Sequence, residues 1–131
     1  MRTPGSIILD SSAILALLFG EQMNQALTAA QLEHAVVSTV NLAEVQAKLV
    51  KLGQDPEEAW ADATSVAADA ADYTSEQAKI AGALVNKTSP FGLSLGDRSC
   101  LALALVMDAP VYTADRVWSN LQIGVPIHII R

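Results

Sequence analysis

The stretch IILDSSAILALLF, residues 7–19, decides the fold class of this chain. It begins with a short apolar run at residues 7–10 and continues as a helical pattern over residues 12–19. An apolar run without alternation is typical of a strand that is covered on both faces of its sheet. Three polar residues interrupt the hydrophobic stretch and no small-residue cleavage site follows it, so we do not interpret it as a signal peptide. We predict a buried strand that leads directly into a helix.

The same arrangement recurs along the rest of the chain, where short apolar runs alternate with helical patterns. Further strands are predicted at residues 35–38, 110–113 and 126–130, with a weaker candidate at 69–73. Helices are predicted at residues 21–33, 39–52, 55–67, 75–87 and 95–107, and the breaker-rich residues 88–95 are predicted to form a loop. Strands that alternate with helices indicate an α/β fold with a mostly parallel central sheet, here of four to five strands flanked by helices.

Length and composition restrict the class of protein further. The chain has 131 residues, of which 51% are hydrophobic and 17% charged. A chain of this length is expected to form one domain, here residues 1–131, with a substantial core. The charged fraction lies below the usual value of about 25%, which excludes a disordered tail protein. The single cysteine, Cys100, excludes an intrachain disulfide and a cysteine-based metal site.

The charge balance argues against broad, non-specific binding to nucleic acid. Eight Lys and Arg residues stand against 14 Asp and Glu residues, which gives a net charge of −6. Proteins that hold a phosphate backbone non-specifically need a basic surface. The same balance is compatible with a small acidic site that binds a cation. No apolar segment reaches the length of about 20 residues that a membrane span needs, and we expect a cytoplasmic protein with no membrane partner.

Four carboxylates occupy related places in the predicted fold. Asp10 ends the first strand, Asp115 follows the strand at 110–113, and Asp97 and Glu44 lie near the starts of helices. In an open parallel sheet, ligands bind beyond the carboxyl ends of the strands, where the following helices also begin. Carboxylates about 6–8 Å apart repel each other, so four together require protonation or a divalent cation. Oxygen ligands without Cys or His favour Mg²⁺ or Mn²⁺.

Each of these carboxylates also fits a purely structural role. Asp10 can cap the helix that follows it, and Asp97 matches a capping box with the serine three positions earlier. Glu44 lies on a polar helix stripe with a lysine one turn later. Asp115 is suited to a turn. From the residues alone, an acidic site and these local roles both remain open.

At these residues the chain resembles the PIN domain, and specifically a VapC-type toxin of a bacterial or archaeal toxin–antitoxin pair. Four blocks match in order: IILDSSAILALLFGE (residues 7–21, with Asp10), STVNLAEVQAKL (38–49, with Glu44), GLSLGDRSCLALAL (92–105, with Asp97) and PVYTADRVW (110–118, with Thr113 and Asp115). The resemblance extends over nearly the whole chain, although residues 53–90 carry no matching motif. It implies a PIN-like fold and a metal-dependent endoribonuclease, which is a hydrolase of RNA phosphodiester bonds.

The resemblance also implies roles for the four acidic residues. Asp10 and Asp97 would be the principal ligands of Mg²⁺ or Mn²⁺, and Asp115 would complete the acidic pocket. Glu44 would act through a water bound to the metal or orient the attacking water. All four are therefore both catalytic and metal-site candidates.

Further residues are implied to contact the substrate. Ser11 and Thr113 match hydroxyl positions that line the pocket in the family. Because the chain is acidic, any basic rim for RNA must be local, and Arg98 and Arg116 are its candidates. The resemblance implies a structured RNA substrate of the tRNA or rRNA class, a homodimer, and inhibition by a cognate VapB-type antitoxin.

Two other functions remain as alternatives to a ribonuclease toxin. One is a non-catalytic PIN-like module that binds RNA or protein, although such a module has no need of four mutually repelling carboxylates. The other is a phosphotransferase with Asp10 as its nucleophile. Ser12 stands two residues after Asp10, where that chemistry needs a second aspartate, so this alternative is the less favoured of the two.

Overall fold

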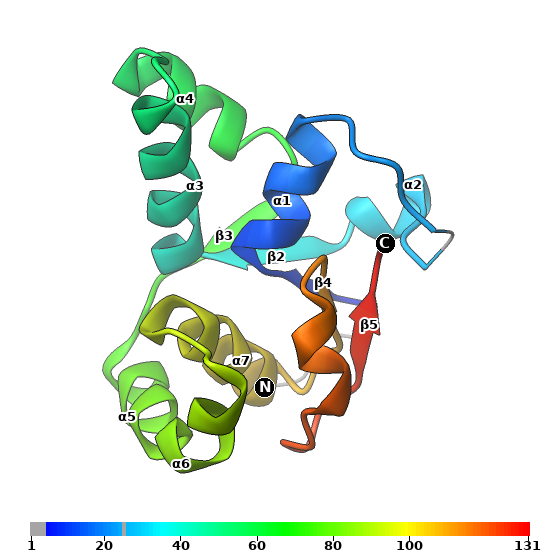
Figure 1. Cartoon of the computed structure of the whole chain (residues 1–131), viewed down its shortest axis with the longest axis vertical. Coiled ribbons are helices and arrows are strands. Elements are labelled where there is room, and N and C mark those ends of the chain that lie inside the picture. Colours follow the sequence, from blue (N-terminus) through cyan, green and yellow to red (C-terminus); the bar gives the residue numbers. More distant parts are fainter. Residues whose placement is uncertain (1–4, 25) are drawn as a thin grey trace.

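The computed structural model describes residues 5–24 and 26–131 (Figure 1). Within these residues five strands form one sheet in the order β3-β2-β1-β4-β5, and every neighbouring pair is parallel. The strands are β1 (Ile7–Leu9), β2 (Ala35–Ser38), β3 (Asp69–Ala71), β4 (Val111–Thr113) and β5 (Ile127–Ile129). The predicted α/β class is confirmed, and the weak strand candidate at residues 69–73 is a real strand at the edge of the sheet.

Helices occupy most of the chain between these strands. The described residues hold α1 (Ser11–Leu18), α2 (Ala29–Leu32), α3 (Thr39–Lys51), α4 (Pro56–Ala63), α5 (Ser75–Ala83), α6 (Val85–Thr88) and α7 (Leu95–Met107), with 3-10 helices η1 (Ser89–Phe91) and η2 (Arg116–Asn120). Helix α7 has the bounds that the sequence predicts, whereas α4 ends four residues before the predicted end and the helix predicted at 75–87 is divided into α5 and α6.

The helix predicted at residues 21–33 is wrong over most of its length. Only α2 is helical, and Thr28 forms a capping box with Gln31 that starts a new helix there. Before it, the backbone N–H of Asn24 donates to the carbonyl of Ile130, and its side chain donates to the carbonyl of Ile129. These bonds to the end of β5 hold the segment in an extended path, which the helical pattern alone does not reveal. Gln25 lies outside the described residues.

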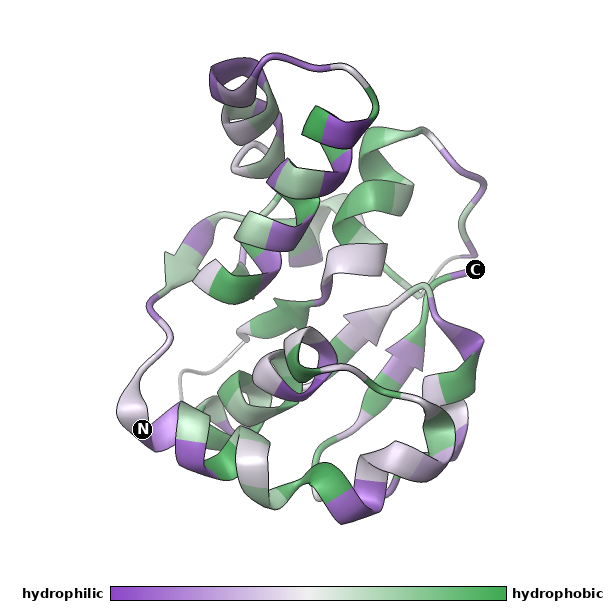
Figure 2. Ribbon diagram, turned by 60° about the vertical axis from the view of Figure 1, so that its left-hand side comes forward, coloured by the Kyte–Doolittle hydropathy of each residue, from purple (hydrophilic) through white to green (hydrophobic). Residues whose placement is uncertain are grey.

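The sheet separates two hydrophobic layers. Ile7 and Leu9 of β1 pack into the layer beneath α1, α3 and α4, whereas Ile8 points to the opposite layer beneath α7. All three side chains are buried, which explains why the strand sequence is continuously apolar. Helix α1 is hydrophobic along most of its length, whereas α3 and α4 alternate hydrophobic and hydrophilic residues (Figure 2). None of the described helices is long and apolar enough to cross a bilayer.

The strand order creates a crevice at one edge of the sheet. The chain moves outward from β1 to β2 and β3 on one side, and then places β4 and β5 on the other. The neighbouring strands β1 and β4 therefore lie where the chain changes direction across the sheet. In open parallel sheets this switch point is where ligands bind, beyond the carboxyl ends of the strands. Asp10 follows β1 and Thr113 ends β4, so both are placed at this crevice.

Candidate active site

Asp10 is a buried carboxylate at the carboxyl end of β1, with only 3% of its surface exposed. It has extended backbone and caps α1, because its Oδ1 accepts a hydrogen bond of 2.8 Å from the backbone N–H of Ala13. The structural role considered for Asp10 is therefore real. The cap uses only one of the lone pairs of the carboxylate, so it does not prevent a second role.

Two hydroxyl groups donate to the same carboxylate. Thr113 Oγ1 lies 2.7 Å from Asp10 Oδ2, and Ser12 Oγ lies 2.9 Å from both carboxylate oxygens. Each hydroxyl in turn accepts a backbone N–H, from Asp115 to Thr113 and from Ala114 to Ser12. These amide bonds direct the hydroxyl protons toward Asp10. Together with the backbone N–H of Ala13, the two hydroxyls donate three hydrogen bonds to the Asp10 carboxylate. A carboxylate has about four lone-pair sites, so one site remains for another ligand.

A second cluster holds the carboxylate of Glu44 on α3. Ser11 Oγ donates to Glu44 Oε1 over 2.6 Å, and Asn41 Nδ2 donates to the same oxygen over 2.9 Å. The amide of Asn41 is buried and also lies within hydrogen-bond distance of Ser11 Oγ and the carbonyl of Gly96 on α7. Asn41 therefore connects α1, α3 and α7 at the point where they meet, and Glu44 is exposed beside it.

Gly96 leaves the space that the Glu44 carboxylate occupies. A Cβ at position 96 would overlap the two carboxylate oxygens and Cδ of Glu44. The glycine lies in the first turn of α7, where its backbone is helical, so a positive φ is not the reason for it. Close approach of α3 and α7 is the reason. The proposed ion pair of Glu44 with a lysine one turn later is absent among the described residues.

Asp97 and Asp115 complete the acidic edge. Asp97 forms the predicted capping box of α7, in which its side chain accepts from the backbone N–H of Ser94. Asp115 is exposed and caps η2, where its Oδ1 accepts from the backbone N–H of Val117. The sequence-based structural roles of both residues are therefore also real. Neither role uses both carboxylate oxygens in the contacts among described residues.

The pKa values show that these carboxylates influence one another. Burial raises the pKa of Asp10 to about 6, against the opposing hydrogen bonds from Thr113, Ala13 and Ser12, and the charge of Asp97 raises it further. Burial also raises the pKa of Asp97, and the charges of Glu44 and Asp115 add to that effect. Carboxylates with raised pKa values, here the buried Asp10 and the half-buried Asp97, are typical of functional sites. Asp97 thus links all four acidic residues electrostatically.

Cys100 lies beneath this edge on α7. It is fully buried, and burial raises the pKa of its thiol well above the ordinary value, with Asp10, Asp97 and Glu44 adding to the shift. The side chain therefore remains a neutral thiol at neutral pH and serves as a small hydrophobic residue of the core.

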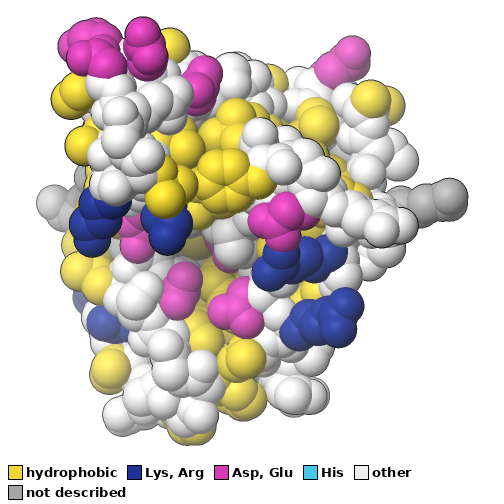
Figure 3. Space-filling view, turned by 45° about the horizontal axis from the view of Figure 1, so that its top comes forward, with side chains coloured by type: hydrophobic (Ala, Val, Ile, Leu, Met, Phe, Trp, Pro, Cys, Tyr) yellow, Lys and Arg dark blue, Asp and Glu magenta, His cyan; other side chains and the backbone are white. Residues whose placement is uncertain are grey.

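The two arginines predicted to contact substrate lie in different settings. Arg98 is half-buried, and its Nη1 donates to the carbonyl of Ala81 on α5. Arg116 is exposed beside Asp115, and its Nε donates to the backbone oxygen of Arg131. On the face in Figure 3, acidic side chains surround a hollowed region and basic side chains stand at both sides of it. Each arginine directly follows an acidic residue of the edge, Asp97 or Asp115, and the guanidinium of Arg116 is directed toward the end of the chain at Arg131.

Sequence reasoning missed several contributors to this site. Ser12 donates to Asp10, Asn41 holds Glu44, and Arg131 reaches the edge from the end of β5. A signal for Asn41 was present, because it precedes Glu44 by three positions and therefore shares its helix face. Arg131 carried no such signal, because its position depends on how β5 pairs with β4.

The donors at this edge fit a hard divalent cation. They are carboxylate and hydroxyl oxygens, which Mg²⁺ and Mn²⁺ prefer, and Asp10 retains one lone-pair site for a ligand. Among the described residues, no three His, Cys, Asp or Glu side chains are arranged to hold one ion together. Mg²⁺ does not require such a cage, because it commonly binds one or two carboxylates and completes its shell with water and substrate phosphate.

Comparisons with known proteins agree with this architecture. The chain is similar in fold to VapBC2 from Rickettsia felis bound to a promoter DNA fragment (14% identity, 95% of this chain and 98% of that chain covered, TM-score 0.69). It is also similar to DNA-bound VapBC from Salmonella typhimurium (16%, 97% and 97%, 0.70) and to VapC20 from Mycobacterium tuberculosis, a sarcin–ricin loop cleaving toxin (18%, 92% and 99%, 0.63). No curated protein matches the sequence significantly.

These identities are too low to carry more than the fold from one protein to another. The sequence itself, however, matches the PIN domain family over residues 7–123. That match includes all four acidic positions, Asp10, Glu44, Asp97 and Asp115. The chain therefore belongs to the PIN domain family.

Proposed function

We propose that this chain, as a single domain of residues 1–131, is a VapC-like toxin that cleaves RNA with the help of Mg²⁺ or Mn²⁺. The observation that carries the proposal is the buried carboxylate of Asp10, held by Thr113 and Ser12 at the switch point and coupled to Asp97. Exposed carboxylates cap helices elsewhere in this chain, at Asp55 and Asp115, so capping alone does not account for a buried carboxylate with a raised pKa at this edge. The cost of this arrangement favours a functional role for it.

The four acidic residues have different proposed roles in phosphodiester hydrolysis. Asp10 and Asp97 are the proposed principal metal ligands, and Asp115 would complete the acidic set. The ion, when bound, would stabilise negative charge on the phosphate and favour ionisation of water. Glu44 is the proposed residue that orients the attacking water. Its carboxylate is held from one side by Ser11 and Asn41, which limits its motion.

The proposed substrate and protein partners follow from the same assignment as a VapC-like toxin. The substrate is proposed to be a structured RNA of the tRNA or rRNA class, and the toxin is proposed to act in the cytoplasm as a homodimer. Several proteins of similar fold were crystallised as toxin–antitoxin complexes. A VapB-type antitoxin is accordingly the proposed inhibitor, and the acidic edge offers it a site for a basic side chain.

Purified protein incubated with total bacterial RNA and Mg²⁺ or Mn²⁺ is expected to produce discrete fragments. Chelation by EDTA should abolish them. Asp97→Asn retains an oxygen for the capping box but removes the charge, so it should lower the cleavage rate by at least the 10–100-fold that loss of a supporting metal-site residue costs. Sequencing the fragment ends measures the products and identifies the RNA.

The matched control is Asp69→Asn, which removes one exposed carboxylate at the start of β3, away from the site. It should cleave at the wild-type rate. Fragments that persist in Asp97→Asn would contradict the assignment and point to a contaminating nuclease. Intact RNA with every variant, in a preparation shown by mass spectrometry to lack a bound antitoxin, would favour a binding module without catalysis.

A further inference from the structure

A pocket opens beside the acidic edge, at the carboxyl ends of β4 and β5. Its volume is about 1030 Å³, and Ser12 and Asp115 belong to its wall as well as to the acidic edge. The rest of the wall comes from residues 21–24 after α1, from Ala114 and Arg116 after β4, and from Arg131 after β5. The pocket and the acidic edge therefore share part of their wall at Ser12 and Asp115.

Two of the four arginines in the sequence meet at this pocket. The Nε of Arg116 donates to the backbone oxygen of Arg131 over 3.1 Å, which fixes one guanidinium close to the backbone of the other residue. The terminal nitrogens of Arg116 have no hydrogen-bond partner among the described residues. In a chain with a net charge of −6, these two guanidinium groups balance the two carboxylates of the same pocket, Glu21 and Asp115. A planar guanidinium is suited to phosphate because it can donate two parallel hydrogen bonds.

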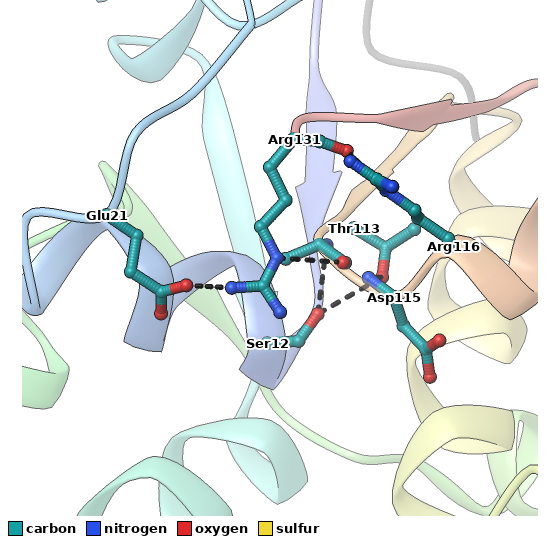
Figure 4. A network of polar contacts seen from close by, with 7 residues as sticks. Ser12, Glu21, Thr113, Asp115, Arg116 and Arg131 are labelled. Carbon is teal, nitrogen blue, oxygen red and sulfur yellow. Dashed lines mark hydrogen bonds and ion pairs between the residues drawn. The ribbon is translucent and has the colours of Figure 1, made fainter.

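Arg131 is already engaged inside the protein. Its Nη1 forms an ion pair with Glu21, and its Nε donates to the carbonyl of Ala114 over 3.3 Å. Figure 4 shows the Arg131 side chain extended between Glu21 and the ends of the strands, with Ser12 close to its guanidinium and Arg116 and Asp115 to one side. Glu21 therefore pairs with the same Arg131 guanidinium that an incoming phosphate would bind. Both partners are partly exposed, so water and a ligand can reach the ion pair.

We propose that Arg116 and Arg131 form a phosphate subsite for the nucleotide next to the bond that is cleaved, and that Glu21 competes with this phosphate for Arg131. The inference rests on the proposed function, because it assumes RNA at the acidic edge. It accounts for how an acidic protein holds a polyanion, since the acidic edge alone would repel it. The Glu21–Arg131 ion pair then weakens binding of RNA that makes no further contacts.

Binding can be measured apart from cleavage with a short fluorescent oligouridylate in EDTA. Arg131→Ala should weaken the affinity by about ten-fold or more, because it removes charged hydrogen bonds to phosphate. It should also reduce the slope of log K against log salt by about 0.7, the contribution of one phosphate contact on a single strand. Lys79→Ala, an exposed lysine on α5, removes the same charge away from the pocket and is the matched control.

Glu21→Gln should have the opposite effect and tighten binding by about two- to five-fold, the range expected from releasing an exposed ion pair. Glu58→Gln on α4 makes the same change in net charge at a distance, and should leave the affinity unchanged. The double variant Glu21→Gln with Arg131→Ala distinguishes competition between Glu21 and phosphate for Arg131 from a general effect of net charge on RNA affinity. Once Arg131 is absent, removal of Glu21 should give no further gain.

Several results would overturn the subsite. The first is that wild-type protein does not bind the oligonucleotide. The second is that Arg131→Ala binds it with the same affinity as Lys79→Ala. The third is that Glu21→Gln still raises the affinity when Arg131 has been replaced by alanine. If wild-type protein cleaves cellular RNA while Arg131→Ala binds normally, the subsite fails and the ribonuclease proposal stands. If Arg131→Ala loses binding but no preparation cleaves RNA, the subsite stands and the catalytic proposal fails. Thermal melting of each variant checks that its fold is retained.

Discussion

Asp10→Asn is expected to raise the stability of the metal-free protein at neutral pH and, at the same time, to lower RNA cleavage by about 100-fold or more. Asn retains the oxygen that caps α1, and its amide can donate to Ser12 and Thr113, because each hydroxyl oxygen has a second lone pair beside the one that accepts a backbone N–H. What the substitution removes is a negative charge that burial disfavours. Stability and activity should therefore move in opposite directions.

The pH dependence of the wild type supplies the sign and size of this effect. The pKa of Asp10 is about 6 in the folded protein and about 3.8 in the unfolded chain. The folded state therefore binds the proton more tightly, and stability falls as the pH rises from about 4 to about 6. A shift of about two units corresponds to about 3 kcal/mol. That loss is fully present above pH 6, is absent below pH 4, and should be missing in Asp10→Asn.

Thermal melting between pH 4 and 8 in EDTA, with and without added Mg²⁺, measures both consequences. Mg²⁺ should raise the melting temperature of the wild type more above pH 6 than below it, because the ion binds the ionised carboxylate. The response should be lost in Asp10→Asn and kept in Asp69→Asn. If Asp10→Asn melts below the wild type at pH 7.5 in EDTA, the buried charge is not the destabilising feature that its environment implies.

The fold was predictable because its signals are local. Continuous apolar runs identified β1 and β2, and the capping box of Ser94 with Asp97 marked where α7 begins. The prediction failed where a distant contact decides the path. Asn24 is drawn to the end of β5, more than 100 residues away, and no helical periodicity in its own segment reports that contact.

The site was predictable to the extent that topology determines it. The rule that parallel strands end at one edge made Asp10, Glu44, Asp97 and Asp115 candidates for one acidic site, although purely local roles stayed open from the residues alone. Their electrostatic coupling agrees with a common location. Their roles in catalysis stay a prediction. The supporting groups could not be found in the same way, because hydrogen bonds such as Asn41 to Gly96 depend on the distance between α3 and α7.

The local roles of the acidic residues and the proposed functional ones do not exclude each other. Asp10 and Asp115 each cap a helix, and Asp97 completes the capping box of α7, in agreement with the local roles that the sequence permits. A cap fixes the position of a carboxylate through one hydrogen bond to backbone N–H and leaves other lone pairs free. The caps therefore hold these groups at the edge of the sheet. Preorganised ligands of this kind are what a metal site requires from its protein.

Gly96→Ala is expected to stabilise α7 and yet to lower RNA cleavage by about 10–100-fold. Alanine is favoured over glycine in a helix by up to about 1 kcal/mol. Its methyl group would occupy the place of the Glu44 carboxylate, which is exposed and can turn toward solvent. Ser11 and Asn41 would then lose the oxygen that they hold. A shift of about 1 Å in a positioned group is enough for a rate loss of this size.

Gly82→Ala is the matched control for this substitution. Gly82 also lies within a helix, α5, and a Cβ there would meet no atom within 4 Å. Both variants should melt at or above the wild-type temperature, because both gain the helical preference of alanine. Only Gly96→Ala should cleave RNA more slowly. Melting curves and initial cleavage rates, taken on the same preparations, separate the two effects.

The double variant Gly96→Ala with Glu44→Gln tests whether the loss passes through Glu44. If the methyl group acts by displacing this carboxylate, it should cost little more once the charge is gone, because the two changes remove one interaction. Equal further loss in the Glu44→Gln background would instead place the effect in α7 itself, through the Gly96 carbonyl that Asn41 contacts. Full activity of Gly96→Ala would mean that the position of Glu44 beside Ser11 is not the one used in catalysis.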